Sequence, residues 1–171
     1  MEPLTERDIR ASFVNCTKGE TKRLAVPTDL VERPWGDLDF LGWRDPRSPQ
    51  RAYLVAESGG TLLGVALRLA SPTAGQPRRS MCSLCLTIHN PGGVSLMTAV
   101  KAGRSGQRGN SVGTYICADL ACSLYLRGKK SAGPATRLQE SLTEQEKIER
   151  TAGKVAAFLA SLTASDSPAT R

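Results

Sequence analysis

Residues 81–127 decide the fold of this chain. The stretch opens with Met81-Cys-Ser-Leu-Cys85 and contains Cys117-Ala-Asp-Leu-Ala-Cys122, so it holds four of the five cysteines as two close pairs. Four thiolates satisfy the tetrahedral preference of zinc and leave no open position for a substrate. The pairs therefore predict one structural zinc ion, with Cys82, Cys85, Cys117 and Cys122 as its ligands.

Other uses of the cysteines are also possible at this point. The four residues could be buried reduced thiols or a redox pair. A disulfide framework is the weakest alternative, because the number of cysteines is odd and the sequence shows no signal peptide. Cys16 has no nearby cysteine partner, and we expect it to be a small buried residue.

The second pair is spaced unusually, with four residues between its cysteines. On a regular helix, residues five apart point about 140° away from each other, so the two thiols could not both reach one ion. We expect Cys117 to follow a strand at residues 114–116 and Cys122 to lie in the first turn of a helix, with Asp119 as the N-cap. A cysteine turn followed by such a helix-start pair is the geometry of a treble clef.

Positive charge is concentrated in the same part of the chain. The net charge is +7, yet residues 1–77 carry ten bases and ten acids, and residues 131–171 carry five of each. Residues 78–130 contain Asp119 as their one acid and eight bases: Arg78, Arg79, Lys101, Arg104, Arg108, Arg127, Lys129 and Lys130. With a tetrathiolate zinc centre of charge about −2, this segment keeps a charge of about +5. Such a surface favours an acidic partner, either nucleic acid or protein, over a merely solvated basic face.

The upstream half predicts a helix and an antiparallel β meander. Thr5 and Asp8 have the spacing of a capping box, so a helix should begin there and end near Val14. The apolar residues between positions 18 and 34 suggest a short strand and a turn. Three apolar runs follow, and the last two flank Gly59-Gly60, which accepts the positive φ angles of a type I′ hairpin turn. The runs are residues 39–43, 52–57 and 61–69. The two tryptophans should belong to the core of this meander or to its rim.

The downstream residues predict a further strand, a loop and a long helix. Residues 94–100 should form a strand, residues 101–113 a flexible basic loop, and Gly128 should end the short helix that contains Cys122. Thr143-Glu-Gln-Glu146 is a capping box. The helix it starts carries one apolar stripe, which should dock on the domain's own sheet. The stripe is Ile148, Ala152, Val155, Leu159 and Leu162.

Together these elements predict the α+β class: an antiparallel β meander followed by a treble-clef zinc finger, with N- and C-terminal helices. Residues 1–77 should form the first helix and the meander half, and residues 78–130 the finger. Residues 131–163 should pack their helix on the same domain, and residues 164–171 should form a disordered tail. No apolar run approaches the 18 residues of a membrane span, so we expect a soluble, cytoplasmic monomer.

The sequence offers no reaction centre. His89 is the one histidine, and a hydrogen bond or a surface position suits it better than a place in a zinc shell that four cysteines already close. The glycines of residues 101–113 lack the Gly-Lys-Ser/Thr ending of a nucleotide-binding loop. Tyr115 should lie either against the metal site or beside the basic loop as an aromatic contact. The chain is therefore predicted to be a binding module and not an enzyme.

These motifs resemble one known family. Met81-Cys-Ser-Leu-Cys85, Val112-Gly-Thr-Tyr-Ile-Cys117 and the four-residue gap before Cys122 are similar to the C-terminal treble-clef domain of elongation factor G-binding proteins, the FusB-type fusidic-acid resistance proteins. The meander with Asp39-Phe-Leu-Gly-Trp43 extends the resemblance over nearly the whole chain. Two departures are that Ser83 stands where those proteins have an aromatic residue and that no counterpart of their N-terminal helical bundle occurs in this sequence.

The resemblance implies a zinc-binding, non-catalytic protein that binds elongation factor G and influences its release from the ribosome. It places Tyr115 among the contacts, and the basic finger residues are expected beside it. The ribosome or its RNA is a possible further partner. The alternative is a zinc-ribbon protein that binds RNA through the same face. The expected contact residues are Lys101, Arg104, Arg108, Tyr115, Arg127, Lys129 and Lys130.

Overall fold

The computed structural model describes residues 1–70, 79–133 and 140–164. It confirms the α+β class and the antiparallel arrangement. One five-stranded sheet has the order β1-β2-β3-β6-β7, and all its pairings are antiparallel. Its strands are β1 (Leu41–Arg44), β2 (Arg51–Ser58), β3 (Thr61–Leu69), β6 (Val94–Val100) and β7 (Ser111–Cys117). The tail predicted at residues 164–171 lies outside the described residues from position 165 onward.

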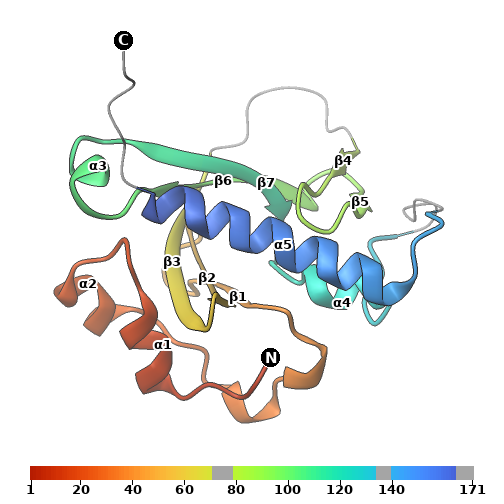
Figure 1. Cartoon of the computed structure of the whole chain (residues 1–171), viewed down its shortest axis with the longest axis horizontal. Coiled ribbons are helices and arrows are strands. Elements are labelled where there is room, and N and C mark those ends of the chain that lie inside the picture. The colour runs from red at the N-terminus through yellow and green to blue at the C-terminus, as the bar shows by residue number, and fades with distance from the viewer. Residues whose placement is uncertain (71–78, 134–139, 165–171) are drawn as a thin grey trace.

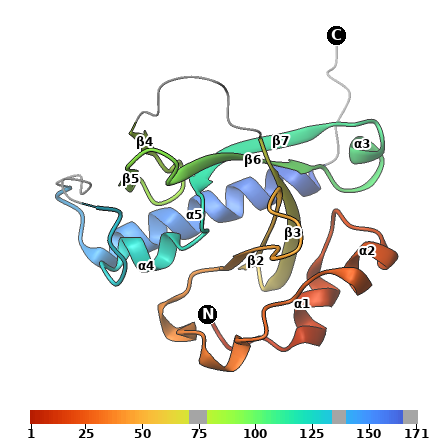
Figure 2. The same cartoon turned by 180° about the vertical axis from the view of Figure 1, so that it is seen from behind.

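Helices cover both faces of this sheet (Figures 1 and 2). The long helix α5 (Glu144–Thr163) crosses one face, and α1 (Glu6–Ser12) and α2 (Lys18–Arg23) lie on the other side together with two 3-10 turns, η1 (Leu30–Glu32) and η2 (Trp35–Asp37). A second, two-stranded sheet pairs β4 (Ser80–Met81) with β5 (Ile88–His89). The remaining helices are the short α3 (Gly103–Gln107) and α4 (Cys122–Leu126). No helix among the described residues is long and apolar enough to cross a bilayer.

The β2–β3 hairpin turns where the two glycines predict. Gly59 and Gly60 have φ angles of 58° and 74°, and Ser58 pairs with Thr61 across them. Two successive positive φ angles match the right-handed twist of the flanking strands. The hairpin fixes the register of the meander, which in turn decides which side chains enter the core.

The sheet separates two apolar cores, because alternate residues of each strand point to opposite faces. On β2, Ala52 and Leu54 belong to the core beneath α5, whereas Tyr53 and Val55 belong to the core beneath α1. The first core also contains the four clustered cysteines. The second contains Trp35 and Trp43, which are 8% and 5% exposed, so of the two positions predicted for the tryptophans, core or rim, both residues take the core.

Helix α5 docks on the sheet as predicted, but with a different stripe. The capping box of Thr143 and Glu146 is present. Ala152 is exposed and Ile148 is half-buried. The prediction for Ala152 was wrong. The predicted stripe alternates steps of four and three residues, which is a period of 3.5, whereas a straight helix has 3.6 residues per turn and turns such a stripe away from the sheet. The buried face is formed instead by Thr151, Val155, Phe158, Leu159 and Leu162.

The N-terminal segment contains one helix more than predicted. The capping box of Thr5 and Asp8 starts α1, which ends at Ser12. Thr17 and Glu20 form a second capping box that starts α2, so the strand predicted after position 18 is wrong. The sequence indicates this helix by the same Thr-x-x-acid pattern that starts α1, and the pattern predicts the local structure better than the apolar residues that follow. Cys16, just before α2, is half-buried.

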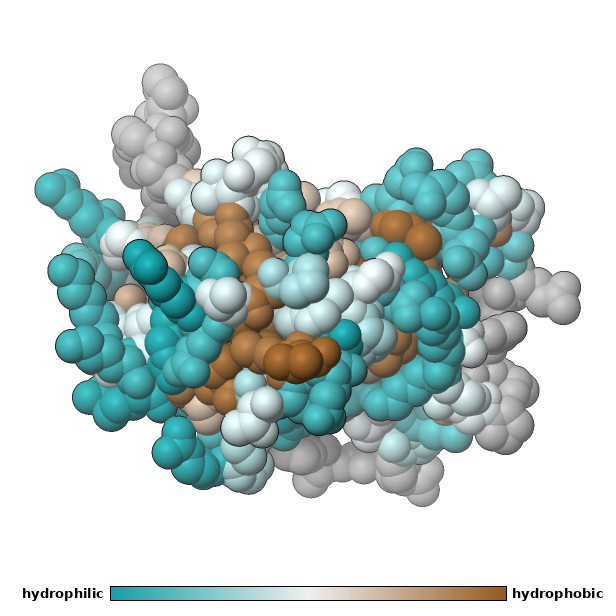
Figure 3. Space-filling view, turned by 90° about the horizontal axis from the view of Figure 1, so that it is seen from below, coloured by the Kyte–Doolittle hydropathy of each residue, from teal (hydrophilic) through white to brown (hydrophobic). Residues whose placement is uncertain are grey.

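The face of the molecule that the N-terminal segment forms is only partly polar. Seen from below, an apolar band lies between hydrophilic side chains (Figure 3). The same side carries η1, in which Val31 is 97% exposed. The N-terminal segment thus covers the sheet while leaving some of its own apolar surface in solvent.

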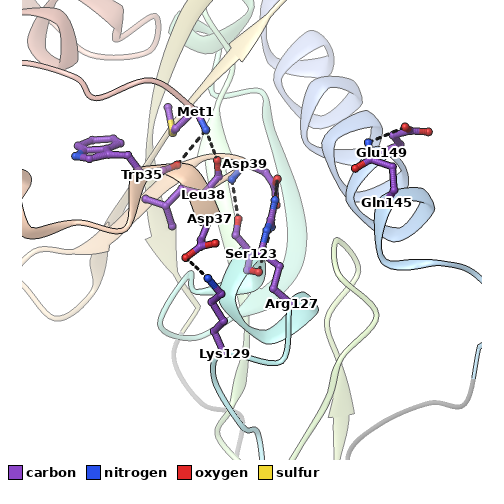
Figure 4. Close-up of polar contacts among 10 residues, drawn as sticks. All are labelled: Met1, Trp35, Asp37, Leu38, Asp39, Ser123, Arg127, Lys129, Gln145 and Glu149. Carbon is purple, nitrogen blue, oxygen red and sulfur yellow. Dashed lines mark hydrogen bonds and ion pairs between the residues drawn. The ribbon is translucent and has the colours of Figure 1, made fainter.

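Polar contacts join the N-terminal half to the end of α4 (Figure 4). The guanidinium of Arg127 donates to both carboxylate oxygens of Asp39, over 2.7 and 2.8 Å. The backbone N–H of Asp39 donates to the Ser123 hydroxyl over 3.0 Å. Lys129 pairs with Asp37 over 2.6 Å. These contacts fix the finger against the meander across almost 90 positions of sequence.

Candidate metal centre

The first cysteine pair lies in the tight turn between β4 and β5. The backbone N–H of Leu86 donates to the carbonyl of Cys82 over 3.0 Å, and the N–H of Cys85 points at the Cys82 sulfur over 3.5 Å. Leu86 has a φ of 59°, an uncommon value for a residue with a side chain. This left-handed residue turns the chain back and leaves both sulfurs on the inner side of the turn.

The second pair joins the end of β7 to the start of α4. Cys117 is the last residue of β7, one position beyond the predicted strand end, and Cys122 begins α4, in the first turn of a helix as predicted. Between them the N–H of Leu120 donates to the carbonyl of Cys117 over 2.8 Å, and Leu120 has a φ of 55°. Both cysteine turns therefore contain a left-handed leucine. The four-residue gap accommodates this reversal before the helix begins.

Asp119 does not cap α4, and this prediction was wrong. The N-cap is Ala121, because the left-handed Leu120 places Asp119 two residues too early. Its carboxylate instead accepts from the N–H of Ala121 over 3.1 Å, from the hydroxyl of Tyr125 over 2.8 Å and from Lys130 over 2.7 Å. Asp119 thus connects the turn to both ends of the helix.

The four sulfurs converge on one point. Cys82 Sγ lies 3.7 Å from Cys122 Sγ, Cys85 Sγ lies 3.5 Å from Cys117 Sγ, and all four ligand atoms lie within 4.8 Å of one another. Four thiolates at about 2.3 Å from a tetrahedral ion would be about 3.8 Å apart. All four cysteines are buried. The donor set and its spacing fit a structural zinc ion.

Burial and hydrogen bonds between the thiols shift the pKa values of the cysteines in different directions before a metal binds. Burial raises the pKa of Cys122, whereas hydrogen bonds from Cys117 and then Cys122 lower the pKa of Cys82. Zinc coordination deprotonates thiols outright. Metal binding should therefore release protons, and the affinity for zinc should rise with pH.

His89 supports the site from outside the ligand set. Its Nε2 atom lies 3.2 Å from Cys117 Sγ, and its ring packs edge-on against Tyr125 with centroids 4.6 Å apart. Burial lowers the pKa of His89 and so favours the neutral ring. A neutral ring that carries its proton on Nε2 donates to the thiolate. Of the two positions predicted for His89, the hydrogen-bonded one fits the contact of Nε2 with Cys117, and the surface position is wrong because the residue is buried.

Replacing this histidine should weaken metal binding without removing a ligand. We expect His89→Phe to keep the ring packing and to lower zinc affinity by about 10- to 100-fold, which is the usual effect of losing an outer-shell partner. Competition with a chromogenic chelator measures the change. Tyr125→Phe is the matched control, since it keeps the aromatic ring beside His89. An unchanged affinity in His89→Phe would show that the N–H···S contact has no effect on the metal.

The first cysteine turn is held from two sides. The backbone N–H of Ser83 donates to the carbonyl of Tyr115 on β7 over 2.7 Å. From α5, Lys154 donates to the carbonyl of Ser83 over 3.0 Å, and the Thr151 hydroxyl lies 3.5 Å from the carbonyl of Leu84. Strand β7 and helix α5 thereby both hold the first cysteine turn in position.

The residues predicted to contact a partner fall into two groups. The first group forms ion pairs within the chain. Arg127 pairs with Asp39, Lys129 with Asp37 and Lys130 with Asp119. The side chains of Arg127 and Asp39 are only 11% and 7% exposed, so this guanidinium is occupied within the fold. Lys130 also lies 5.6 Å from the centre of the Tyr125 ring.

The second group lies on the β6–β7 hairpin. Tyr115 is 55% exposed, Arg104 and Arg108 are exposed, and Lys101 is half-buried. Residues 101–113 are not the loop that we predicted, because α3 occupies 103–107 and β7 begins at 111. The backbone N–H of Asn110 donates to the carbonyl of Ser105 over 3.2 Å, which closes the turn after α3. The basic side chains are thus presented by a folded turn.

The arrangement of cysteine turn, β hairpin and helix is that of a treble clef, and a comparison with family models agrees. Residues 8–162 match the family described as the FBP C-terminal treble-clef zinc-finger. The chain belongs to this family.

Among solved structures, this treble-clef protein is similar to the structure of the fusidic acid resistance protein FusC. The TM-score is 0.45 and the sequence identity 22%. The match covers 60% of this chain and 45% of the FusC chain, so it spans less than half of that protein. A comparison with curated proteins gave no match.

Proposed function

We propose that this protein binds translation elongation factor G in the cytoplasm and influences its release from the ribosome. The observation that carries the proposal is the exposed Tyr115, on a strand whose last residue is a zinc ligand, beside the basic turn of Arg104 and Arg108. Membership of the FBP treble-clef family supports it. The zinc ion would be structural, because four cysteines fill its coordination sphere, and the protein would act by binding.

The physical basis of this binding would be a rigid aromatic anchor with basic neighbours. Tyrosine and arginine are enriched among the residues that contribute most to protein interfaces. A metal-anchored strand restricts the backbone of Tyr115 before binding, so less conformational entropy is lost on association. The basic turn would raise the rate of encounter with an acidic surface.

The second candidate is RNA binding through the same face, and the excess of seven positive charges in residues 78–130 favours it. Salt separates the two. Phosphate binding weakens with a log-log slope of about 0.9 per neutralised phosphate, whereas a protein complex depends more on shape. We would incubate the purified protein with elongation factor G and with ribosomes, each at two salt concentrations. Retention of neither would refute both functions.

Tyr115 provides a more specific test. We expect Tyr115→Ala to weaken the complex with elongation factor G by at least about tenfold, as for an anchor residue. Tyr115→Phe keeps the ring and should bind within about threefold of the unmodified chain. Isothermal titration calorimetry measures both. Since Tyr115 is 55% exposed, neither change should alter the melting temperature appreciably. Equal binding by the alanine variant would exclude Tyr115 from the interface.

A further inference from the structure

The hydrogen bonds of the β6–β7 hairpin determine which backbone groups of β7 point outward. In an antiparallel pair, residues alternate between those that bond to the partner strand and those that face away from it. Leu96 and Tyr115 are opposite each other, and their carbonyls accept from Ala70 and Ser83, which lie outside the hairpin. Leu96 and Tyr115 are therefore an outward-facing pair.

The same alternation applies two and four residues along the strand. Gly113 and Ser111 must also direct their N–H and C=O groups away from β6. Apart from the carbonyl of Tyr115, these outward groups have no partner within the described part of the chain. Ser111, Gly113 and Tyr115 are all exposed. Because glycine has no side chain, the exposure of Gly113 is exposure of the backbone itself.

Strand β1, at the other edge of the sheet, contacts the second cysteine turn. A Cβ atom on Gly42 of β1 would lie 2.5 Å from the Cβ of Leu120, so the second cysteine turn packs directly on this strand. Arg44 donates to the carbonyl of Ala118 over 3.1 Å. Natural edge strands are usually short, charged, kinked by proline or covered. Strand β7 has seven residues, and its sequence Ser-Val-Gly-Thr-Tyr-Ile-Cys has neither charge nor proline.

We propose that the outer edge of β7 accepts an extended acidic segment of a partner protein as a further strand of the sheet. Backbone N–H and C=O groups in a row are complementary to another extended backbone, and main-chain bonds supply affinity in this mode. The exposed Arg104 and Arg108 lie just before the strand, and they select for Asp and Glu in the incoming segment. A second copy of this chain would bring like charges together, which disfavours self-pairing.

This inference deepens the proposed function and rests on it for the identity of the partner. The partner would be a protein, because only a polypeptide backbone has N–H and C=O groups at the spacing of a β-strand, and RNA has none. The bound segment would lie beside Ser111 and Gly113 and end at the N–H of Tyr115, because the carbonyl of Tyr115 is already bonded to Ser83. The Tyr115 side chain would contact the end of the segment. The zinc ion would keep the edge straight through Cys117 at its end.

Gly113 allows a matched pair of variants. A Cβ atom there would lie 3.2 Å from Leu96 Cδ1 and 3.3 Å from Thr98 Cγ2, and both Gly113→Ala and Gly113→Pro introduce it. Only proline also removes the outward N–H, and it removes no bond to β6. We expect Gly113→Pro to bind elongation factor G at least about tenfold more weakly than Gly113→Ala. Zinc content should be equal in the two variants.

Amide hydrogen exchange on the unmodified chain tests the same point without a substitution. On binding elongation factor G, the amides of Ser111, Gly113 and Tyr115 should gain protection, while those of Val112 and Thr114 should change little. A synthetic peptide of alternating glutamate and valine serves as a second probe. The same peptide with lysine in place of glutamate is the control, and it should give no protection.

Four outcomes distinguish this inference from the proposed function. Alternating protection by the factor, with loss of binding in Gly113→Pro, supports both. A complex with elongation factor G that leaves the three amides unprotected, with equal binding of the two variants, overturns the edge inference and leaves the function standing. Protection by the acidic peptide without a complex with the factor supports the edge and refutes the proposed partner. Protection by neither probe overturns the edge inference.

Discussion

Replacing Cys122 by serine is expected to abolish cooperative folding of this protein. The sulfur of Cys122 is one of four that converge within 4.8 Å. Structural zinc contributes about 10–16 kcal/mol to the folding of zinc-finger peptides, which is comparable to the 5–15 kcal/mol stability of a whole domain. Loss of one ligand should therefore remove most of the net stability. Zinc content by mass spectrometry and thermal unfolding by circular dichroism measure the two effects.

Cys16→Ser is the control for this experiment, since Cys16 lies outside the cluster. It should retain one zinc ion per chain and a melting temperature close to that of the unmodified protein. A strong chelator should reproduce the effect of Cys122→Ser. A metal-free chain that keeps its full melting temperature would contradict a structural role for the ion.

The second large effect is expected at the junction between finger and meander. Arg127→Met should destabilise the protein by about 3–5 kcal/mol, because it leaves the Asp39 carboxylate buried without its partner. The Asp39 side chain is only 7% exposed. Asp39→Leu combined with Arg127→Met should recover much of the loss, since an apolar pair of similar volume avoids the unpaired charge. Urea unfolding followed by tryptophan fluorescence measures these changes.

Lys129→Met provides the matched comparison. Lys129 also pairs with an aspartate of the N-terminal half, but the two side chains are 54% and 26% exposed. An ion pair in solvent contributes about 0–1 kcal/mol, so this variant should lose little stability. Equal losses in Arg127→Met and Lys129→Met would show that burial of the Asp39 pair is unimportant.

The zinc site and the meander could be predicted because their signals are local. Two cysteines in a turn, two glycines between apolar runs, or a threonine three residues before an acid each fix a short backbone conformation. The left-handed Leu86 and Leu120 could not be predicted this way, because leucine rarely adopts positive φ. Because the chain reverses at Leu120, Asp119 lies before the N-cap position that we predicted for it.

The use of the basic residues was harder to predict than their presence. Arg127 looked like a surface residue of a basic segment, but it pairs with Asp39, which lies 88 positions earlier in the sequence. No local pattern reports a contact at that separation. The net charge of residues 1–77 is zero, so it did not indicate that Asp37 and Asp39 pair with residues of the finger. Of the three paired bases, Arg127 is in a buried pair, whereas Lys129 and Lys130 are 54% and 46% exposed and stay among the predicted contacts.

The packing of the second cysteine turn on β1 links the meander to the metal site. Leu120 packs on Gly42 and lies between Cys117 and Cys122 in the chain, so loss of the ion is expected to loosen this contact. In a zinc-starved cell, newly made chains would expose the apolar surface of β1 that Leu120 covers, and exposed apolar surface promotes aggregation and proteolytic clearance. The amount of this protein in the cell would then follow the availability of the ion, with no dedicated sensor required.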